Sequence, residues 1–124
     1  MRKQYNFRPG DHGLDAWDVE RLIELSADLP VKDVALESIK ELDTDYWFRF
    51  GPVPTVRRII EQVRLIQEVD PSYPIILGED ERVMDGMHRI ARAMLDGHST
   101  IKAVQFLVEP EPDYRNRTPG ELPY

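Results

Sequence analysis

The 124-residue chain contains no cysteine, and this absence excludes whole classes of chemistry. Without thiols the protein has no disulfides, no zinc–thiolate or iron–sulfur site and no thiol nucleophile. The chain also lacks an apolar run of about 18 residues, the length that a membrane-spanning helix needs. Its first residues, MRKQYNF, do not form the apolar segment of a signal peptide. We therefore expect a cytoplasmic protein that has no membrane partner.

Positive charge is scarce, with 16 Lys and Arg against 23 Asp and Glu and a net charge of −7. Ten of the acidic residues but three of the basic ones lie between positions 15 and 45, so this segment carries the whole excess. Nucleic acid is a disfavoured partner, because contacts to phosphates need a basic footprint. The acidic segment favours a basic protein as an alternative partner.

Apolar periodicity and the positions of Gly and Pro predict one α+β domain, a small mixed β-sheet covered by helices. The expected strands lie near 31–36, 75–77, 82–84 and 101–108, and the expected helices near 16–28, 56–69 and 88–96. Asp15 is the expected N-cap of the first helix, and the second helix is expected to bury Ile59, Val63 and Ile66 on one stripe.

Three segments divide the chain by composition. Residues 1–30 are expected to hold a loose N-terminal arm, over residues 1–14, followed by the acidic helix. Residues 31–108 would form the folded module. Residues 109–124 contain four of the ten prolines and few apolar side chains, so we expect this tail to contribute no core element. An alternative stays open, in which the tail lies across the surface with Tyr114, Leu122 and Tyr124 as anchors.

The sequence VMDGMHRIARA, residues 83–93, predicts a strand, a tight turn and a helix. Gly86 permits a close approach of a ligand to the backbone. The first amides of the helix face outward, and with the helix dipole they attract anions. His88 and Arg89 add a hydrogen-bond donor and a cation that can hold phosphate oxygens. A purely structural alternative stays open, in which Asp85 pairs with His88 or Arg89.

Residues 34–106, about 73 of the 124, resemble the ParB/sulfiredoxin superfamily. The order of elements is similar, and the most specific segment is DGMHRIARAMLDG, which resembles the family's Gly-x-His-Arg box. In the family this box holds nucleotide phosphates. The resemblance implies a ParB/sulfiredoxin-like fold in which Gly86, Met87, His88 and Arg89 cradle the phosphates of ATP or CTP, with Mg²⁺ brought by the nucleotide.

The chain also departs from this family. Sulfiredoxins have their reactive cysteine where Met87 stands, so sulfinic acid reduction is excluded. ParB proteins continue into a helix-turn-helix and a dimerisation domain, so centromere binding is disfavoured. The sequence shows no cluster of carboxylates that would hold a catalytic metal, and no metal held by the protein alone is predicted.

Other residues are candidates for the same site. Glu37 lies near the place where serine kinases of this superfamily have a carboxylate base, and it is equally well explained as a solvated acid. Thr55 offers a hydroxyl at the start of the second helix, and one of Arg57 and Arg58, with Arg57 as the predicted site residue, offers a cation. Salt bridges to Glu61 or to the acidic segment explain such arginines too. Four aromatic residues, Tyr46, Trp47, Phe48 and Phe50, can stack on a base or seal an edge of the core.

These observations favour a nucleotide-binding protein, with a phosphotransferase or NTPase as the candidate activity. His88 would then act as donor, Arg89 as phosphate clamp and Glu37 as base. The alternatives are a non-catalytic interaction module that uses its acidic surface and, less favoured, a ParB-like DNA-binding protein. A homodimer through the first helix or the aromatic loop also stays open.

Overall fold

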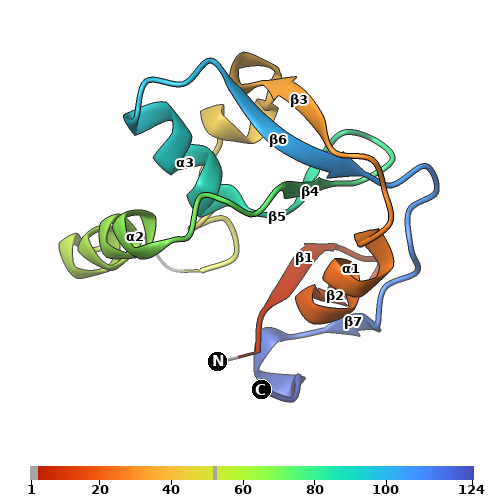
Figure 1. Ribbon diagram of the computed structural model, residues 1–124. Helices are drawn as coiled ribbons and strands as arrows, with labels where there is room; N and C mark the ends of the chain where they lie inside the picture. The colour runs from red at the N-terminus through yellow and green to blue at the C-terminus, as the bar shows by residue number, and fades with distance from the viewer. Residues whose placement is uncertain (1–2, 52) are drawn as a thin grey trace.

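The computed structural model describes residues 3–51 and 53–124, and it has the expected α+β architecture, with three helices and two small sheets (Figure 1). The strands are β1 (Tyr5–Pro9), β2 (Leu14–Asp18), β3 (Lys32–Ala35), β4 (Ile75–Leu77), β5 (Val83–Asp85), β6 (Thr100–Gln105) and β7 (Tyr114–Arg117). The α-helices are α1 (Val19–Ser26), α2 (Val56–Glu68) and α3 (Met87–Leu95). Short 3₁₀ turns are η1 (Leu36–Ser38), η2 (Lys40–Asp43) and η3 (Pro119–Glu121).

The larger sheet has the strand order β3-β6-β4-β5. The pair β4–β6 is parallel and the other two pairs are antiparallel, so the expected mixed sheet is confirmed. In β4, Ile75 and Leu77 point to one face and Ile76 to the other, as the alternation of side chains along a strand requires. All three are buried, because both faces of this sheet are covered.

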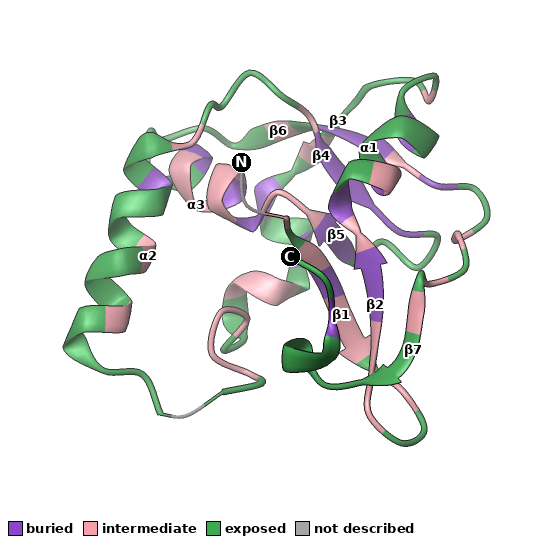
Figure 2. Ribbon diagram, turned by 90° about the horizontal axis from the view of Figure 1, so that it is seen from below, coloured by how far each residue is buried: buried purple, intermediate pink, exposed green. Residues whose placement is uncertain are grey.

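Each face of the larger sheet builds its own core. On one face, Leu36, Met87 and Ile90 from η1 and α3 pack on the sheet. On the other face, Trp17 and Leu22 from β2 and α1 complete a second cluster. Figure 2 shows the buried segments concentrated in the central strands and in the helix faces that meet them.

The N-terminal arm is a hairpin, so the prediction of a loop over residues 1–14 is wrong for β1 and the start of β2, while residues 1 and 2 lie outside the described residues. Strands β1 and β2 pair antiparallel from Tyr5 opposite Asp18 to Pro9 opposite Leu14. Because β2 extends to Asp18, that residue caps α1 in place of Asp15, accepting a hydrogen bond from the Glu20 amide at 3.0 Å.

The C-terminal tail also departs from expectation, because β7 pairs with β2 and completes a three-stranded sheet, β1-β2-β7. The indole Nε1 of Trp17 donates to the carbonyl oxygen of Pro110 at 2.7 Å. Leu122 is buried, and the ring of Tyr124 meets the ring of Tyr5 edge-on at 5.4 Å. The two ends of the chain thus lie together, as Figure 1 shows.

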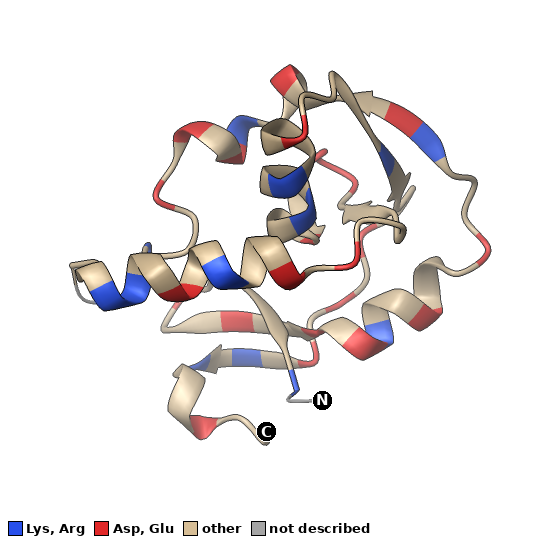
Figure 3. Cartoon of the chain, turned by 60° about the vertical axis from the view of Figure 1, so that its left-hand side comes forward, with Lys and Arg blue, Asp and Glu red and all other residues tan. Residues whose placement is uncertain are grey.

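Several residues of the acidic segment make hydrogen bonds or ion pairs that stabilise the fold. The Asp15 carboxylate accepts a hydrogen bond from the Asn116 amide at 3.2 Å, and Asp18 pairs with Lys3 at 2.9 Å. Glu41 accepts from the amide of Val83 on the edge strand β5. Exposed acidic residues remain along α1 (Figure 3), namely Glu20 and Glu24. In the described part of the chain, no helix is long and apolar enough to cross a membrane.

Candidate functional site: an aromatic pocket beside helix α2

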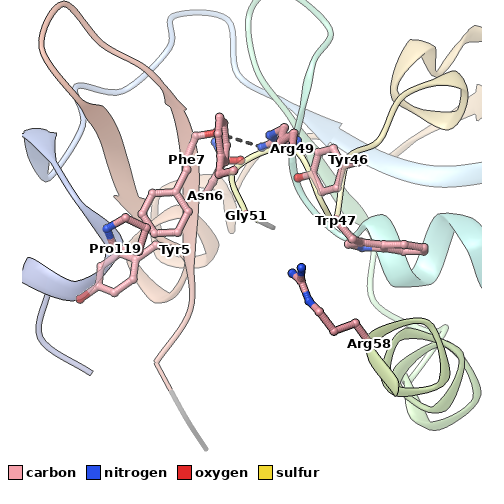
Figure 4. A pocket seen from close by; sticks show the side chains of 10 residues that line it. Tyr5, Asn6, Phe7, Tyr46, Trp47, Arg49, Gly51, Arg58 and Pro119 are labelled. Carbon is pink, nitrogen blue, oxygen red and sulfur yellow. Dashed lines mark hydrogen bonds between the residues drawn. The ribbon is translucent and has the colours of Figure 1, made fainter. Parts of the chain in front are cut away.

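A pocket of about 340 Å³ lies where the N-terminal hairpin, the aromatic loop at residues 46–51 and helix α2 meet. Figure 4 shows Tyr5 and Phe7 on one side, Tyr46 and Trp47 on the other, and the Arg58 side chain extending between them from α2. The lining residues are Tyr5, Asn6, Phe7, Tyr46, Trp47, Arg49, Phe50, Gly51, Arg58 and Pro119. This volume falls at the lower end of the range for small-molecule sites, roughly 300–1,000 Å³.

The aromatic loop is fixed by one arginine. The guanidinium of Arg49 lies 4.0 Å from the ring centre of Tyr46 and 4.7 Å from that of Phe50. Its Nη2 donates to the carbonyl oxygen of Phe7 at 3.0 Å, which ties the loop to β1. Burial raises the pKa of the Tyr46 hydroxyl above its usual value, so the pocket wall stays neutral at this residue.

The start of α2 supplies a second arginine. Thr55 caps the helix, with its hydroxyl accepting from the Arg58 amide at 3.2 Å. The Arg58 guanidinium lies 5.2 Å from the ring centre of Phe48 and lines the pocket. Arg57 is exposed and is turned about 100° away around the helix. Of the two arginines that open this helix, the structure brings Arg58 to the pocket, whereas Arg57 was the one predicted as a site residue.

Two buried donors in the pocket wall have no acceptor among the described residues. They are Nδ2 of Asn6, a residue that is 5% exposed, and Nε1 of Trp47. A buried N–H group without an acceptor costs about 1–3 kcal/mol, and such groups are rare in native proteins.

His88 lies directly behind Trp47. Its ring stacks on the indole at 4.9 Å between centres and 12° between planes, and its Nε2 is 2.7 Å from Oε1 of Gln62 on α2. Burial, helped by the neighbouring Arg89, lowers the pKa of His88 below its usual value. The ring is therefore neutral at pH 7, and it supports Trp47 from the side away from the pocket.

The Gly-x-His-Arg segment does form a strand, a turn and a helix start. Gly86 is the N-cap of α3 with φ +110°, and a Cβ at this position would lie 2.6 Å from Cγ2 of Ile75, so no other residue fits. Having no side chain, Gly86 offers the first-turn amides no capping group. The side chain of Met87 is buried in the core beneath the sheet.

Arg89 is held by protein groups. Its Nη2 donates to the Asp85 carboxylate at 3.0 Å and to the carbonyl oxygen of Pro74 at 3.2 Å. This is the structural alternative that the sequence left open for the segment. Its Nε is buried and, like the two donors of the pocket wall, has no acceptor in the part of the chain that the structure describes.

The other candidates lie apart from His88. The amide of Leu36 bonds to the carbonyl oxygen of Ser99, which places Glu37 beside the turn after α3, whereas His88 is at the helix start. A nine-residue helix is about 13 Å long, so the two side chains flank opposite ends. Thr55 lies seven residues before Gln62, about 10 Å along α2 from the contact with His88.

Sequence reasoning missed the contribution of the hairpin. Tyr5, Asn6 and Phe7 lie in a segment that was expected to be a loop. The sequence PGDHG at residues 9–13 carried the missing signal, since a Pro- and Gly-rich turn between two mixed segments is typical of a hairpin.

A scan against protein-family models and searches of the curated proteins and of the solved structures gave no match to this chain.

Proposed function

We propose that the chain binds a nucleotide in the aromatic pocket. The observation that carries the proposal is the combination of aromatic rings and two arginines around one pocket. The rings offer stacking surfaces for a base.

The phosphate group is assigned to Arg58. Its guanidinium reaches into the pocket from the first turn of α2 (Figure 4), and an arginine is suited to hold phosphate oxygens through paired hydrogen bonds. Arg49 donates a hydrogen bond to the carbonyl oxygen of Phe7 and lies over the rings of Tyr46 and Phe50, so it fixes the shape of the pocket wall. In this proposal the Gly86–Arg89 segment, which carries the ParB/sulfiredoxin resemblance, does not hold the phosphate. It supports Trp47 through the stacked ring of His88.

The proposal is for binding and includes no catalytic step. Among the described residues, Glu37 and His88 flank opposite ends of α3, so they do not converge on one reacting atom. The described residues also contain no group of three or more His, Asp or Glu side chains placed to hold a metal ion. The Mg²⁺ of the proposal comes with the nucleotide.

The test is a thermal-shift and calorimetry panel with ATP, CTP, GTP and inorganic phosphate, each with and without Mg²⁺. A ligand at 100 times its dissociation constant stabilises the fold by about 2.7 kcal/mol, which is readily measured. We expect one nucleotide to give this shift. Arg58→Gln should abolish it, whereas Arg82→Gln, which removes an exposed charge on the β4–β5 hairpin, should leave it unchanged.

Two further variants locate the phosphate. Arg57→Gln and Arg89→Gln should retain binding once each is compared with its own ligand-free stability. Loss of binding in Arg89→Gln with retention in Arg58→Gln would move the phosphate to the start of α3. The absence of a shift for every nucleotide would overturn the proposal.

A further inference from the structure

His88 is a titratable side chain that lies directly behind the wall of the aromatic pocket. Its ring stacks on the indole of Trp47, and Trp47 lines the pocket together with Arg58 (Figure 4). An imidazole gains or loses a charge near neutral pH. A proton on His88 therefore places a positive charge one ring away from whatever the pocket binds.

The contact between His88 and helix α2 is compatible with both protonation states of the ring. Nε2 of His88 lies 2.7 Å from Oε1 of Gln62, and an amide oxygen only accepts hydrogen bonds. Nε2 therefore donates in the neutral ring, and Nδ1 is the atom that takes up the second proton. Because Nε2 donates in both states, protonation adds a charge without breaking the hydrogen bond to Gln62.

Charged groups on three elements influence this proton. Burial lowers the pKa of His88 below its usual value, Arg89 on α3 lowers it further, and the carboxylate of Asp85 at the end of β5 raises it. On α2, Arg58 lies one turn before the residue that contacts His88, hence on the same side of that helix. The aromatic loop faces the ring with an uncharged indole. Without a ligand, these surroundings favour the neutral ring at pH 7.

A bound anion changes these surroundings in favour of the protonated ring. In the proposed nucleotide complex the phosphate lies on Arg58, so its negative charge offsets that cation and attracts a proton on His88 across the pocket wall. Binding and protonation are linked, and a ligand that favours the proton on His88 binds more tightly when His88 carries it. The affinity for an anionic ligand should therefore rise as the pH falls.

We propose that His88 makes binding in the aromatic pocket dependent on pH, with the protonated ring favouring an anionic ligand. The inference rests on the proposed function, since it needs a nucleotide in the pocket. It adds regulation by pH to that function. His88 touches neither base nor phosphate, and its charge acts across Trp47.

The first test is the tryptophan emission of the ligand-free chain between about pH 7.5 and about pH 5, the range in which an imidazole titrates. The chain has two tryptophans, and Trp17 packs on the other face of the larger sheet, so the contact with His88 belongs to Trp47. A charged imidazole quenches the emission of an indole that it touches more strongly than a neutral imidazole does. The emission of the wild type should therefore fall with the pH.

Two variants control this test. His88→Phe keeps an aromatic ring on Trp47 but carries no titratable proton, so its emission should not follow the pH. His98→Gln removes an exposed imidazole after α3 and should behave like the wild type. Wild-type emission that stays constant, or that changes equally in His88→Phe, overturns the proposal.

The second test is calorimetric titration of the same three chains with ATP, CTP and GTP. Between about pH 7.5 and about pH 5.5, the ratio of the wild-type affinity to that of His88→Phe should rise about threefold, the size of a single partly solvated charge interaction. This ratio cancels the titration of the nucleotide's own phosphate, which has a pKa of about 6. The ratio of the wild-type affinity to that of His98→Gln should not depend on pH.

His88→Gln repeats the comparison without an aromatic ring, and circular dichroism of each variant establishes that the fold is retained. Nucleotide binding whose pH dependence is the same in the wild type and in both His88 variants overturns this inference and leaves the proposed function intact. Absence of binding at both pH values overturns the proposed function and, with it, this inference.

Discussion

Helices α2 and α3 lie against each other, but they differ in how many of their apolar side chains are buried. The nine-residue α3 buries Met87, Ile90 and Ala93 beneath the larger sheet. The 13-residue α2 buries only Ile66 and leaves five large apolar side chains exposed. Both helices have a clear apolar stripe in the sequence. The comparison shows that the stripe establishes the helix, whereas the neighbouring elements decide whether it becomes core or surface.

The largest expected difference between the helices follows from matched truncations. Ile90→Ala removes a side chain with no exposed surface and should reduce the free energy of unfolding by about 4 kcal/mol. Ile60→Ala removes the same atoms from a side chain that is mostly in solvent, so its cost should stay within about 0.5 kcal/mol. Urea unfolding of both variants measures the two values. Equal losses would contradict the contrast between the helices.

The two ends of α3 provide the next comparison. Gly86, before the helix, and Gly97, after it, both have positive φ, +110° and +79°. An alanine Cβ at Gly86 would lie 2.6 Å from Ile75 Cγ2, whereas nothing lies within 4 Å of one at Gly97. Gly97→Ala therefore carries only the backbone strain, about 1 kcal/mol, and Gly86→Ala should cost about 3 kcal/mol because the clash is added.

Thermal and urea unfolding of the two glycine variants give this difference directly. If Gly86→Ala cost no more than Gly97→Ala, β4 would have to shift away from the helix start without loss of packing. That result would show that the turn before α3 is held less tightly than the structure indicates.

The sequence predicted the larger sheet and α3 well because their signals are local. The run IIL at residues 75–77 is buried on both faces, and Gly97 follows the apolar stripe of α3. The third strand of the smaller sheet could not be predicted because its pairing is not local: β2 pairs with β7, about 100 residues later, and β7 has the entirely polar-and-aromatic sequence YRNR. The β1–β2 hairpin that carries Tyr5, Asn6 and Phe7 is local, but the aromatic loop that it meets lies about 40 residues later, so spacing along the chain did not predict the pocket wall.

The α2–α3 contact itself gives the smallest predicted effect, through His88. Burial lowers the pKa of His88 below its usual 6.5, with Arg89 contributing to the shift, so the folded chain takes up this proton less readily than the unfolded chain. As far as His88 is concerned, the free energy of unfolding should therefore be highest above about pH 6.5. It should decrease as the pH falls toward the lowered pKa and become constant below that pKa. His88→Gln removes the titrating ring, so the difference in stability between wild type and variant should shrink as the pH falls from about 7.5 to about 5. Urea unfolding across this range measures the difference, and a constant difference would mean that the stack on Trp47 and the contact with Gln62 place no penalty on the charged ring.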